Sequence, residues 1–248
     1  MPVSAEDFAR AERRAIFKYL SVALLLILGA VLAYQRLASS QDSRKALNDG
    51  EQMLKAGRYA EAIAAFDRAL AADRGLAKGY LFRARANAAM NRNEAAIRDF
   101  TKVIQLQPGN AGALVERAAV HLGADEYPEV IADCDQALQR DSELSYAYML
   151  RGIAWRGSGD LSRSLENFNR AVELTPGMET YSQRAATYQS LGEHPKAIAD
   201  LDQVVSISPS SPMGYLARAR SREALGDGPG ARNDREAGRR LAGWPPAR

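Results

Sequence analysis

The chain has 248 residues, of which 46% are hydrophobic and 25% are charged, as in an ordinary globular protein of one or two domains. Its formal net charge of +3 gives no bulk electrostatic reason to expect a nucleic-acid partner. The single cysteine, Cys134, excludes an intrachain disulfide and zinc sites with two or four cysteine ligands.

The first distinctive element is an apolar run near the N-terminus. Residues 19–34 carry no charged side chain, and the run extends back to residue 15 if the flexible stem of Lys18 carries its charge to the interface. A helix of about 20 residues crosses a hydrocarbon core of roughly 30 Å. The sequence therefore predicts a cytoplasmic tail over 1–14, a transmembrane helix over 15–36 and a linker over 37–42.

A cleaved signal peptide and a buried core helix are the alternative interpretations of this run. Small residues before Tyr34 suit a signal peptidase, but the preceding stretch contains Glu6, Asp7 and Glu12, unlike the short basic start of a signal peptide. Basic residues are slightly more numerous before the run than after it, which favours a cytoplasmic N-terminus. Arginine-rich, alanine-rich usage is typical of GC-rich bacterial genomes, so we expect a single-pass protein of a bacterial inner membrane with its C-terminal part in the periplasm.

The remainder of the chain repeats one phrase at steps of 33 or 34 residues. "AAIRDFTKVIQLQP", from Ala95, recurs as "EVIADCDQALQRDS", "RSLENFNRAVELTP" and "KAIADLDQVVSISP". "EAIAAFDRALAADR" precedes these copies, and an eroded "GARNDREAGRRLAG" follows them. A second helical phrase and a turn come before each copy, which predicts a stack of helical hairpins. We expect repeats at 43–76, 77–110, 111–144, 145–177, 178–211 and 212–243, and a flexible tail at 244–248.

A helix-turn-helix unit of this length resembles the tetratricopeptide repeat. The first copy shows the pattern of small and large packing positions, with Gly50, Ala62 and Phe66. The resemblance implies an all-α, right-handed α-solenoid of about six hairpins, preceded here by the transmembrane helix. In the last repeat Arg235 occupies the large apolar position, so that hairpin is predicted to be a polar cap.

Arginine recurs at one position of the first helices, and aspartate recurs at one position of the second helices. We predict that each arginine pairs with the aspartate of its own or the next hairpin, as a structural ion pair rather than a ligand site. Asn167 replaces the aspartate in the fourth repeat, where the pair should be weaker. The predicted ladder comprises Arg83, Asp99, Arg117, Asp133, Arg151, Arg184, Asp200, Arg218 and Asp234.

The resemblance also implies that an extended peptide or a partner helix binds on the concave face, which the first helices line. Tyr146, Met149 and Ile153 recur at helical spacing and predict an apolar patch flanked by Arg85 and Arg156, unless neighbouring repeats cover it. The residues at groove-facing positions are Lys78, Leu81, Arg85, Val115, Tyr146, Met149, Ile153, Arg156, Ser182, Gln189, Leu216 and Arg220.

Members of the family that hold the carboxylate tail of a chaperone use a lysine and an asparagine on one first helix, and an asparagine with a lysine or arginine on the next. The corresponding residues here are Leu47, Glu51, Leu81 and Arg85, so this clamp is absent.

Catalytic and metal-binding motifs are not evident in the sequence. His121 and His194 are the only histidines and belong to no metal-binding motif, and the repeats occupy nearly all of the chain after residue 42. We therefore expect no enzymatic activity, no metal and no cofactor.

The expected function is that of a membrane-anchored adaptor or scaffold that binds protein or peptide partners near the membrane and contacts lipid through residues 15–36. The alternatives are a structural subunit of a larger membrane complex or oligomer, and a receptor that faces the cytosol.

Overall fold

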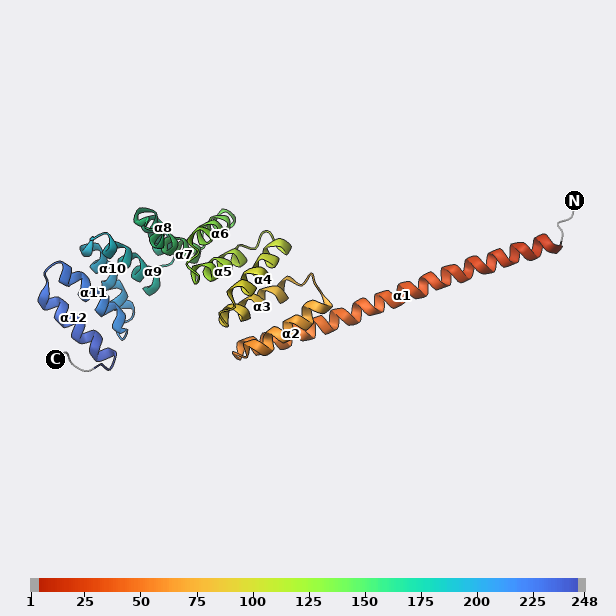
Figure 1. Cartoon of the computed structure of the whole chain (residues 1–248), viewed down its shortest axis with the longest axis horizontal. Helices are drawn as coiled ribbons and strands as arrows, with labels where there is room; N and C mark the ends of the chain where they lie inside the picture. The colour runs from red at the N-terminus through yellow and green to blue at the C-terminus, as the bar shows by residue number, and fades with distance from the viewer. Residues whose placement is uncertain (1–4, 245–248) are drawn as a thin grey trace. The chain divides into compact units, whose positions relative to one another are not determined.

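The computed structural model describes residues 5–244, except for the side chains of residues 5–23, 33 and 35–39. These residues form twelve α-helices, and no strand occurs among them (Figure 1). The helices are α1 (Ala5–Lys55), α2 (Tyr59–Ala72), α3 (Ala77–Ala89), α4 (Asn93–Leu106), α5 (Ala111–Leu122), α6 (Tyr127–Arg140), α7 (Ser145–Gly157), α8 (Leu161–Leu174), α9 (Met178–Ser190), α10 (His194–Ile207), α11 (Pro212–Ala224) and α12 (Gly228–Leu241).

Helix α1 runs without interruption from Ala5 into the first hairpin. Residues 37–42, the expected linker, are helical, and this segment contains neither glycine nor proline to end the helix. Among the side chains that the structure describes, no helix offers a stretch both long and apolar enough to cross a membrane. Much of the predicted span lies outside that description, namely residues 15–23, 33, 35 and 36, as do residues 1–4 and 245–248 of the predicted tails.

The helices divide into two compact units, one ending at Ala86 and the other beginning at Asn87. In the first unit, the C-terminal part of α1 packs against α2 around the buried ring of Phe66, whose centroid lies 5.9 Å from that of Phe82 on α3. Gly50 makes this packing close, since a Cβ there would fall 2.4 Å from the Phe66 ring.

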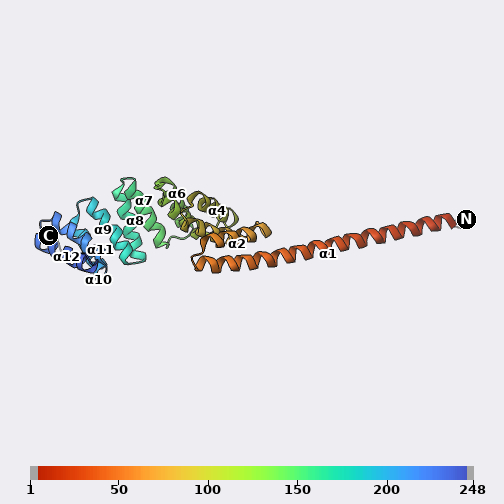
Figure 2. The same ribbon diagram turned by 60° about the horizontal axis from the view of Figure 1, so that its bottom comes forward.

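The second unit is a regular stack of antiparallel helix pairs. Helix α5 pairs with α6, α7 with α8, α9 with α10 and α11 with α12, and each pair packs on the next (Figure 2). First helices of neighbouring pairs also touch, α5 with α7 and α7 with α9, which places them along the inner face of this stack. The architecture is therefore an all-α solenoid of helical hairpins, as predicted.

Each hairpin turn contains one residue in the left-handed region, at the same repeat position. Glycine fills it in four turns, and asparagine or aspartate, the other residue types that tolerate positive φ, fills it in two. These residues are Gly57 (φ 73°), Asn91 (56°), Asp125 (57°), Gly159 (87°), Gly192 (73°) and Gly226 (77°). The turn conformation is thus the same in every repeat, including the two in which asparagine or aspartate replaces glycine.

Large apolar residues of the second helices form the core between hairpins. Phe168 is fully buried, and Gly152 on the paired helix lets its ring approach, because a Cβ there would lie 3.0 Å from the ring. Cys134 takes the same repeat position and is buried with Leu114 and Leu150. In the last hairpin Arg235 occupies this position and bonds Glu223, with a side chain that is 42% exposed. A charged, partly exposed residue at this place ends the apolar seam.

Candidate partner-binding surface

The arginines of the predicted ladder lie against the second helices of their own hairpins. Arg117 donates from Nε and Nη2 to both carboxylate oxygens of Asp133, at 2.8 and 2.6 Å. Arg184 and Asp200 repeat this geometry at 2.8 and 2.7 Å, and Arg218 and Asp234 at 2.9 and 2.6 Å. In the fourth repeat Arg151 donates from Nε to the neutral amide oxygen of Asn167 at 2.8 Å. Arg83 and Asp99 belong to different units, and their pairing stays a prediction.

The remaining Nη1 group of each arginine reaches the preceding hairpin, not the following one. Arg117 donates to Thr101 at 2.8 Å and Arg218 to Asp202 at 2.7 Å, while Arg151 bonds Asp135. The acceptors share one repeat position, two residues beyond the aspartate position of the preceding hairpin. They are Asp67, Thr101, Asp135, Asn169 and Asp202. Each arginine thus ties its own hairpin to the one before it.

The hydrogen bonds of the ladder also shift the pKa of its arginines. The hydrogen bond to the buried Asp133 raises the pKa of Arg117, and that to Asp200 raises the pKa of Arg184. The aspartates have side chains only 4–7% exposed in the Arg117, Arg184 and Arg218 pairs. A buried carboxylate with a bidentate guanidinium partner has little capacity left for a ligand, so the ladder is a poor binding site.

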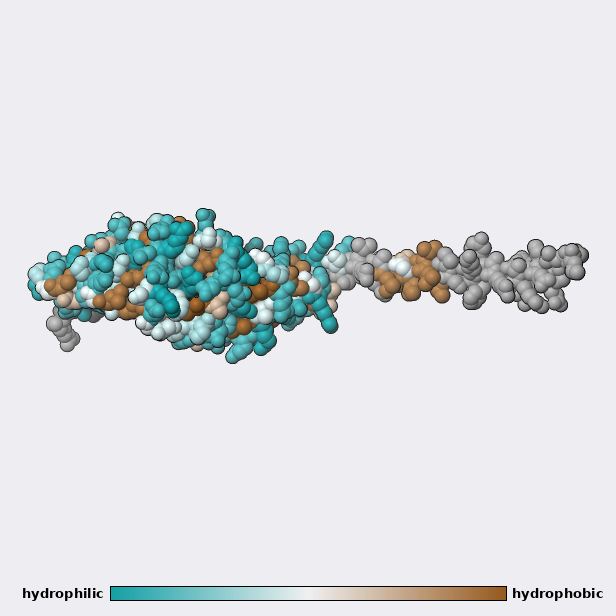
Figure 3. Space-filling model, turned by 90° about the horizontal axis from the view of Figure 1, so that it is seen from above, coloured by the Kyte–Doolittle hydropathy of each residue, from teal (hydrophilic) through white to brown (hydrophobic). Residues whose placement is uncertain are grey.

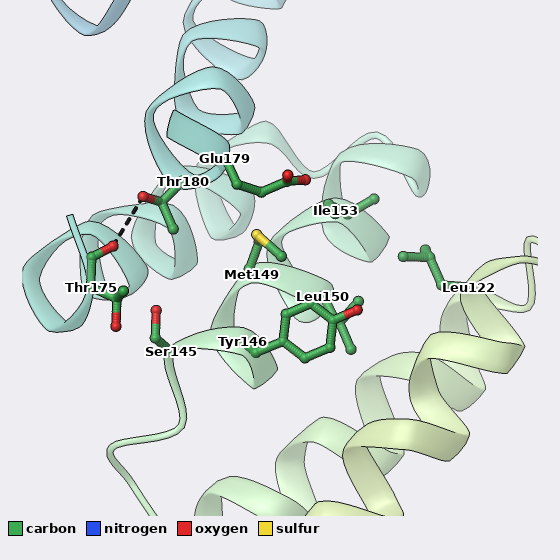
Figure 4. A pocket seen from close by; sticks show the side chains of 9 residues that line it. All are labelled: Leu122, Ser145, Tyr146, Met149, Leu150, Ile153, Thr175, Glu179 and Thr180. Carbon is green, nitrogen blue, oxygen red and sulfur yellow. Dashed lines mark hydrogen bonds between the residues drawn. The ribbon is translucent and has the colours of Figure 1, made fainter. Parts of the chain in front are cut away.

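A hollow of about 670 Å³ opens on the inner face of the second unit, where α5, α7 and α9 meet (Figure 4). We call it the α7 hollow, because most of its central lining residues lie in α7. It is lined by Leu122, Ser145, Tyr146, Met149, Leu150, Ile153, Thr175, Glu179 and Thr180. The predicted patch of Tyr146, Met149 and Ile153 therefore lies together, as the helical spacing requires.

The members of the patch differ in exposure. Tyr146 is 50% exposed, whereas Met149 is buried with 7% exposed. Burial raises the pKa of the Tyr146 hydroxyl, and the nearby carboxylates of Glu179 and Glu116 add to this effect. The hollow thus combines an apolar floor with a negative electrostatic environment at its rim.

Arg156, which was predicted to flank the patch, instead joins α7 to α9. Its guanidinium donates to the backbone oxygen of Gln183 at 3.0 Å and to the Gln183 side chain at 2.7 Å. Burial lowers the pKa of Arg156. Gln189 makes the equivalent contact one repeat later, with bonds to the Ala217 oxygen at 2.9 Å and to Ser221 at 2.7 Å. Both predicted groove residues therefore hold neighbouring first helices together.

The other predicted groove residues do not reach the α7 hollow. Val115 is buried with 7% exposed, Ser182 donates to the backbone oxygen of Met178, and Leu216 packs against Gly238 of α12. Arg220 is exposed on α11. Lys78, Leu81 and Arg85 belong to the first unit and are not part of this site.

Two residues of the hollow that sequence reasoning missed were detectable from the repeat. Leu122 lies one repeat before Arg156, and Glu179 lies one repeat after Tyr146. The remaining lining residues, such as Thr175, enter the site from the ends of helices, where the repeat positions carry no groove assignment.

Reactive or metal-binding chemistry is not supported at this surface. Burial raises the pKa of the Cys134 thiol to about 12, so it is protonated at neutral pH. Within the described residues, no group of three or more His, Cys, Asp or Glu side chains could hold a metal ion.

Comparison with known proteins shows the family. The Tetratricopeptide repeat profiles match residues 50–111, 81–144 and 179–211, about half of the chain. The chain belongs to the tetratricopeptide repeat family.

The curated relatives are longer proteins that share part of this chain. The Hsp70-Hsp90 organizing protein of Triticum aestivum is 31% identical over 114 residues, which cover 44% of this chain and 20% of that protein. Hsc70-interacting protein 1 of Drosophila melanogaster is 36% identical over 87 residues, which cover 35% of this chain and 23% of that protein. The matches thus span about a fifth of these relatives.

Solved structures show the same fold at lower identity. MamA (41-end) from Desulfovibrio magneticus RS-1 superposes with a TM-score of 0.64 at 20% identity, over 68% of this chain and 96% of that one. The TPR protein TTC0263 from Thermus thermophilus gives a TM-score of 0.58 at 18% identity, over 74% and 98%. At these identities the likeness concerns the fold alone.

Proposed function

We propose that this protein is a non-enzymatic, membrane-anchored adaptor or scaffold that binds protein or peptide partners on the inner face of its hairpin stack. The observation that carries the proposal is the α7 hollow, where Tyr146 and Ile153 stay accessible above a buried apolar floor. Apolar concave sites with a few polar groups at the rim are the usual form of binding pockets. The predicted setting is a bacterial inner membrane, with residues 15–36 in the bilayer and the hairpins in the periplasm.

Exposed aliphatic side chains on α1 support the membrane anchor. Residues 24–32 are all apolar, and the large ones, Leu24–Leu28, Val31 and Leu32, are 46–69% exposed. Figure 3 shows this stretch as a brown segment of the long helix. A helix that is apolar on every side requires an apolar surrounding, such as lipid. Because α1 continues into the first hairpin, such an anchor would connect to the solenoid without a flexible linker.

The names of the curated relatives suggest a chaperone-linked role, but the site residues do not favour tail capture. At the positions of the carboxylate clamp this chain has Leu47, Glu51, Leu81 and Arg85. Leu47 is 8% exposed in the core of the first unit, so it cannot contact a ligand. We therefore propose a partner other than an acidic chaperone tail.

Site-specific photocrosslinking in native membranes tests the adaptor proposal. A photoreactive phenylalanine analogue replaces Tyr146 in the hollow and, as a control, the exposed Glu129 on α6. We expect defined protein adducts, identified by mass spectrometry, from position 146 only. Equal adducts at both positions, or none at position 146, would refute binding at the inner face.

Carbonate extraction and a C-terminal topology reporter test the anchor separately. The proposal requires that the chain stays with the membrane pellet and that the reporter is active in the periplasm. Release by carbonate, or a reporter active in the cytoplasm, contradicts the anchor or its orientation.

A structural subunit of an oligomer is the second candidate, and the last hairpin is the observation that favours it. Met213, Leu241 and Trp244 are 66%, 43% and 58% exposed there. Apolar residues at the end of a solenoid suit contact with another copy or subunit. Light scattering of the detergent-solubilised chain distinguishes the two functions, since a defined oligomer favours the subunit and a monomer favours the adaptor.

A further inference from the structure

We propose that the α7 hollow selects partner segments in which an apolar side chain lies next to a lysine or arginine. This inference rests on the proposed function, and it names the chemistry of the segment that the same site would bind.

The floor of the hollow accounts for the apolar half of this preference. Leu122 from α5 and Leu150 and Ile153 from α7 face the same space (Figure 4). The hollow has a volume of about 670 Å³, so an incoming aliphatic or aromatic group can be withdrawn from water there. Removing such a side chain from water favours binding, because the apolar area exposed to water decreases.

The carboxylate of Glu179 accounts for the basic half. Glu179 lies in the first turn of α9, and in Figure 4 its side chain extends above Met149 toward the side of Ile153. It is exposed, and among the described residues it forms no hydrogen bond or ion pair. This carboxylate is therefore available to a partner, while those of the arginine ladder are already bonded.

The two arginines of α7 near the hollow have partners elsewhere. Arg151, which follows Leu150, bonds Asp135 and Asn167. The guanidinium of Arg156 is held by Gln183 on α9. The charges that act on the Tyr146 hydroxyl include those of Glu179 and Glu116, and both raise its pKa, as negative charges do. Glu179 thus places a negative charge at the rim of the hollow, although the whole chain has a net charge of +3.

Charge complementarity follows from these contacts. A basic residue beside an inserted apolar side chain would pair with Glu179, whereas an acidic residue would be repelled by the same carboxylate. The sequence analysis placed Arg156 beside this patch, whereas in the structure its guanidinium is held by Gln183.

Fluorescence anisotropy with the full chain in detergent tests this selectivity. The probe is a labelled 12-residue peptide in which leucine and lysine residues alternate and the remaining positions are glycine or serine. Two matched peptides replace lysine with glutamate, or leucine with serine. We expect the leucine-lysine peptide to bind at least about tenfold more tightly than either, and about 0.5 M NaCl to reduce this preference over the glutamate peptide.

Variants of the hollow give the decisive comparison. Glu179→Gln should weaken leucine-lysine binding about three- to fivefold, as expected for one partly exposed ion pair. Tyr146→Ser should weaken binding of the leucine-lysine peptide, because it removes an apolar contact, and it should leave the preference for lysine over glutamate unchanged. The matched control is Glu129→Gln, which removes an exposed first-turn carboxylate on α6 and should change nothing.

Each other outcome counts against the inference. Equal binding of the lysine and glutamate peptides, or full binding by Glu179→Gln, overturns the basic preference and leaves the adaptor proposal standing if crosslinks form at position 146. If none of the three peptides binds, the inference is wrong. The adaptor proposal is wrong as well only if no crosslinks form at position 146. If light scattering shows an oligomer that Tyr146→Ser dissociates, the occupant of the hollow is a second copy of the chain and the inference is wrong.

Discussion

The ion pair of Arg184 and Asp200 makes a stringent test of the arginine ladder. Asp200 has a side chain only 7% exposed and receives two bonds from Arg184, at 2.8 and 2.7 Å. In Arg184→Ala that carboxylate loses both bonds and lies in a place that water reaches poorly. Removing one partner of a buried pair costs about 3–5 kcal/mol. Because the Arg184 side chain is 19% exposed, water can enter the space that it leaves, and we expect a loss of about 2–3 kcal/mol in the free energy of unfolding.

The second variant, Asp200→Asn, should cost less. Asparagine keeps one acceptor, as Asn167 does for Arg151, but loses the charge and the second bond. We expect a loss of about 1–2 kcal/mol, since hydrogen bonds to charged groups are stronger than neutral ones. In the double variant the uncompensated carboxylate is absent, so the two losses should not add.

Urea unfolding followed by circular dichroism measures these changes, and hydrogen exchange of α9 and α10 locates them. Local exchange is needed because hairpin arrays can open one part at a time. The control is Glu173→Ala, which breaks an exposed pair with Arg170 and should cost at most about 0.5 kcal/mol. If Arg184→Ala destabilises no more than this control, the ladder does not stabilise the stack and our reasoning is wrong.

Two further predictions concern packing. Gly157→Ala places a Cβ 2.4 Å from the Tyr127 ring and should destabilise the protein by about 1–3 kcal/mol in thermal melts. The control Gly109→Ala, which has nothing within 4 Å of its Cβ, should have little effect. Equal effects of the two substitutions would contradict the close contact. Burial raises the pKa of the Cys134 thiol to about 12. Cys134 should therefore not react with a disulfide reagent at about pH 8 until guanidinium unfolds the chain. Prompt reaction of the native protein would show that this core position is accessible to the reagent.

The fold was predictable because its determinants are local and repeated. The 34-residue period predicted the hairpins, and prolines such as Pro128 and Pro195 do lie in the first turns of second helices. Each turn needs one residue that tolerates positive φ, and glycine, asparagine and aspartate provide it. The continuity of α1 through residues 37–42 was not predicted, although the sequence there has no helix-breaking residue.

The site was predictable only in part, because groove positions were assigned without knowing which side chains already have partners. Periodicity brought Tyr146, Met149 and Ile153 to one face of α7, and they do lie together. It could not show that Arg156 is long enough to reach the backbone of the next first helix, nor that Met149 would be covered. Long flexible side chains make contacts that depend on distances between helices, and these distances are set by packing.

The sequence by itself thus determined the helical hairpins and the pairing of arginine with the second helix, because both depend on residues that recur at a constant spacing. Only the tertiary structure decided that the arginines also reach back to the preceding hairpin, and that the hollow at α7 is lined by Glu179 instead of Arg156. The difference is physical. Spacing along a chain defines which residues share a face, but the charge of a surface depends on which of those residues remain unpaired after neighbouring helices pack.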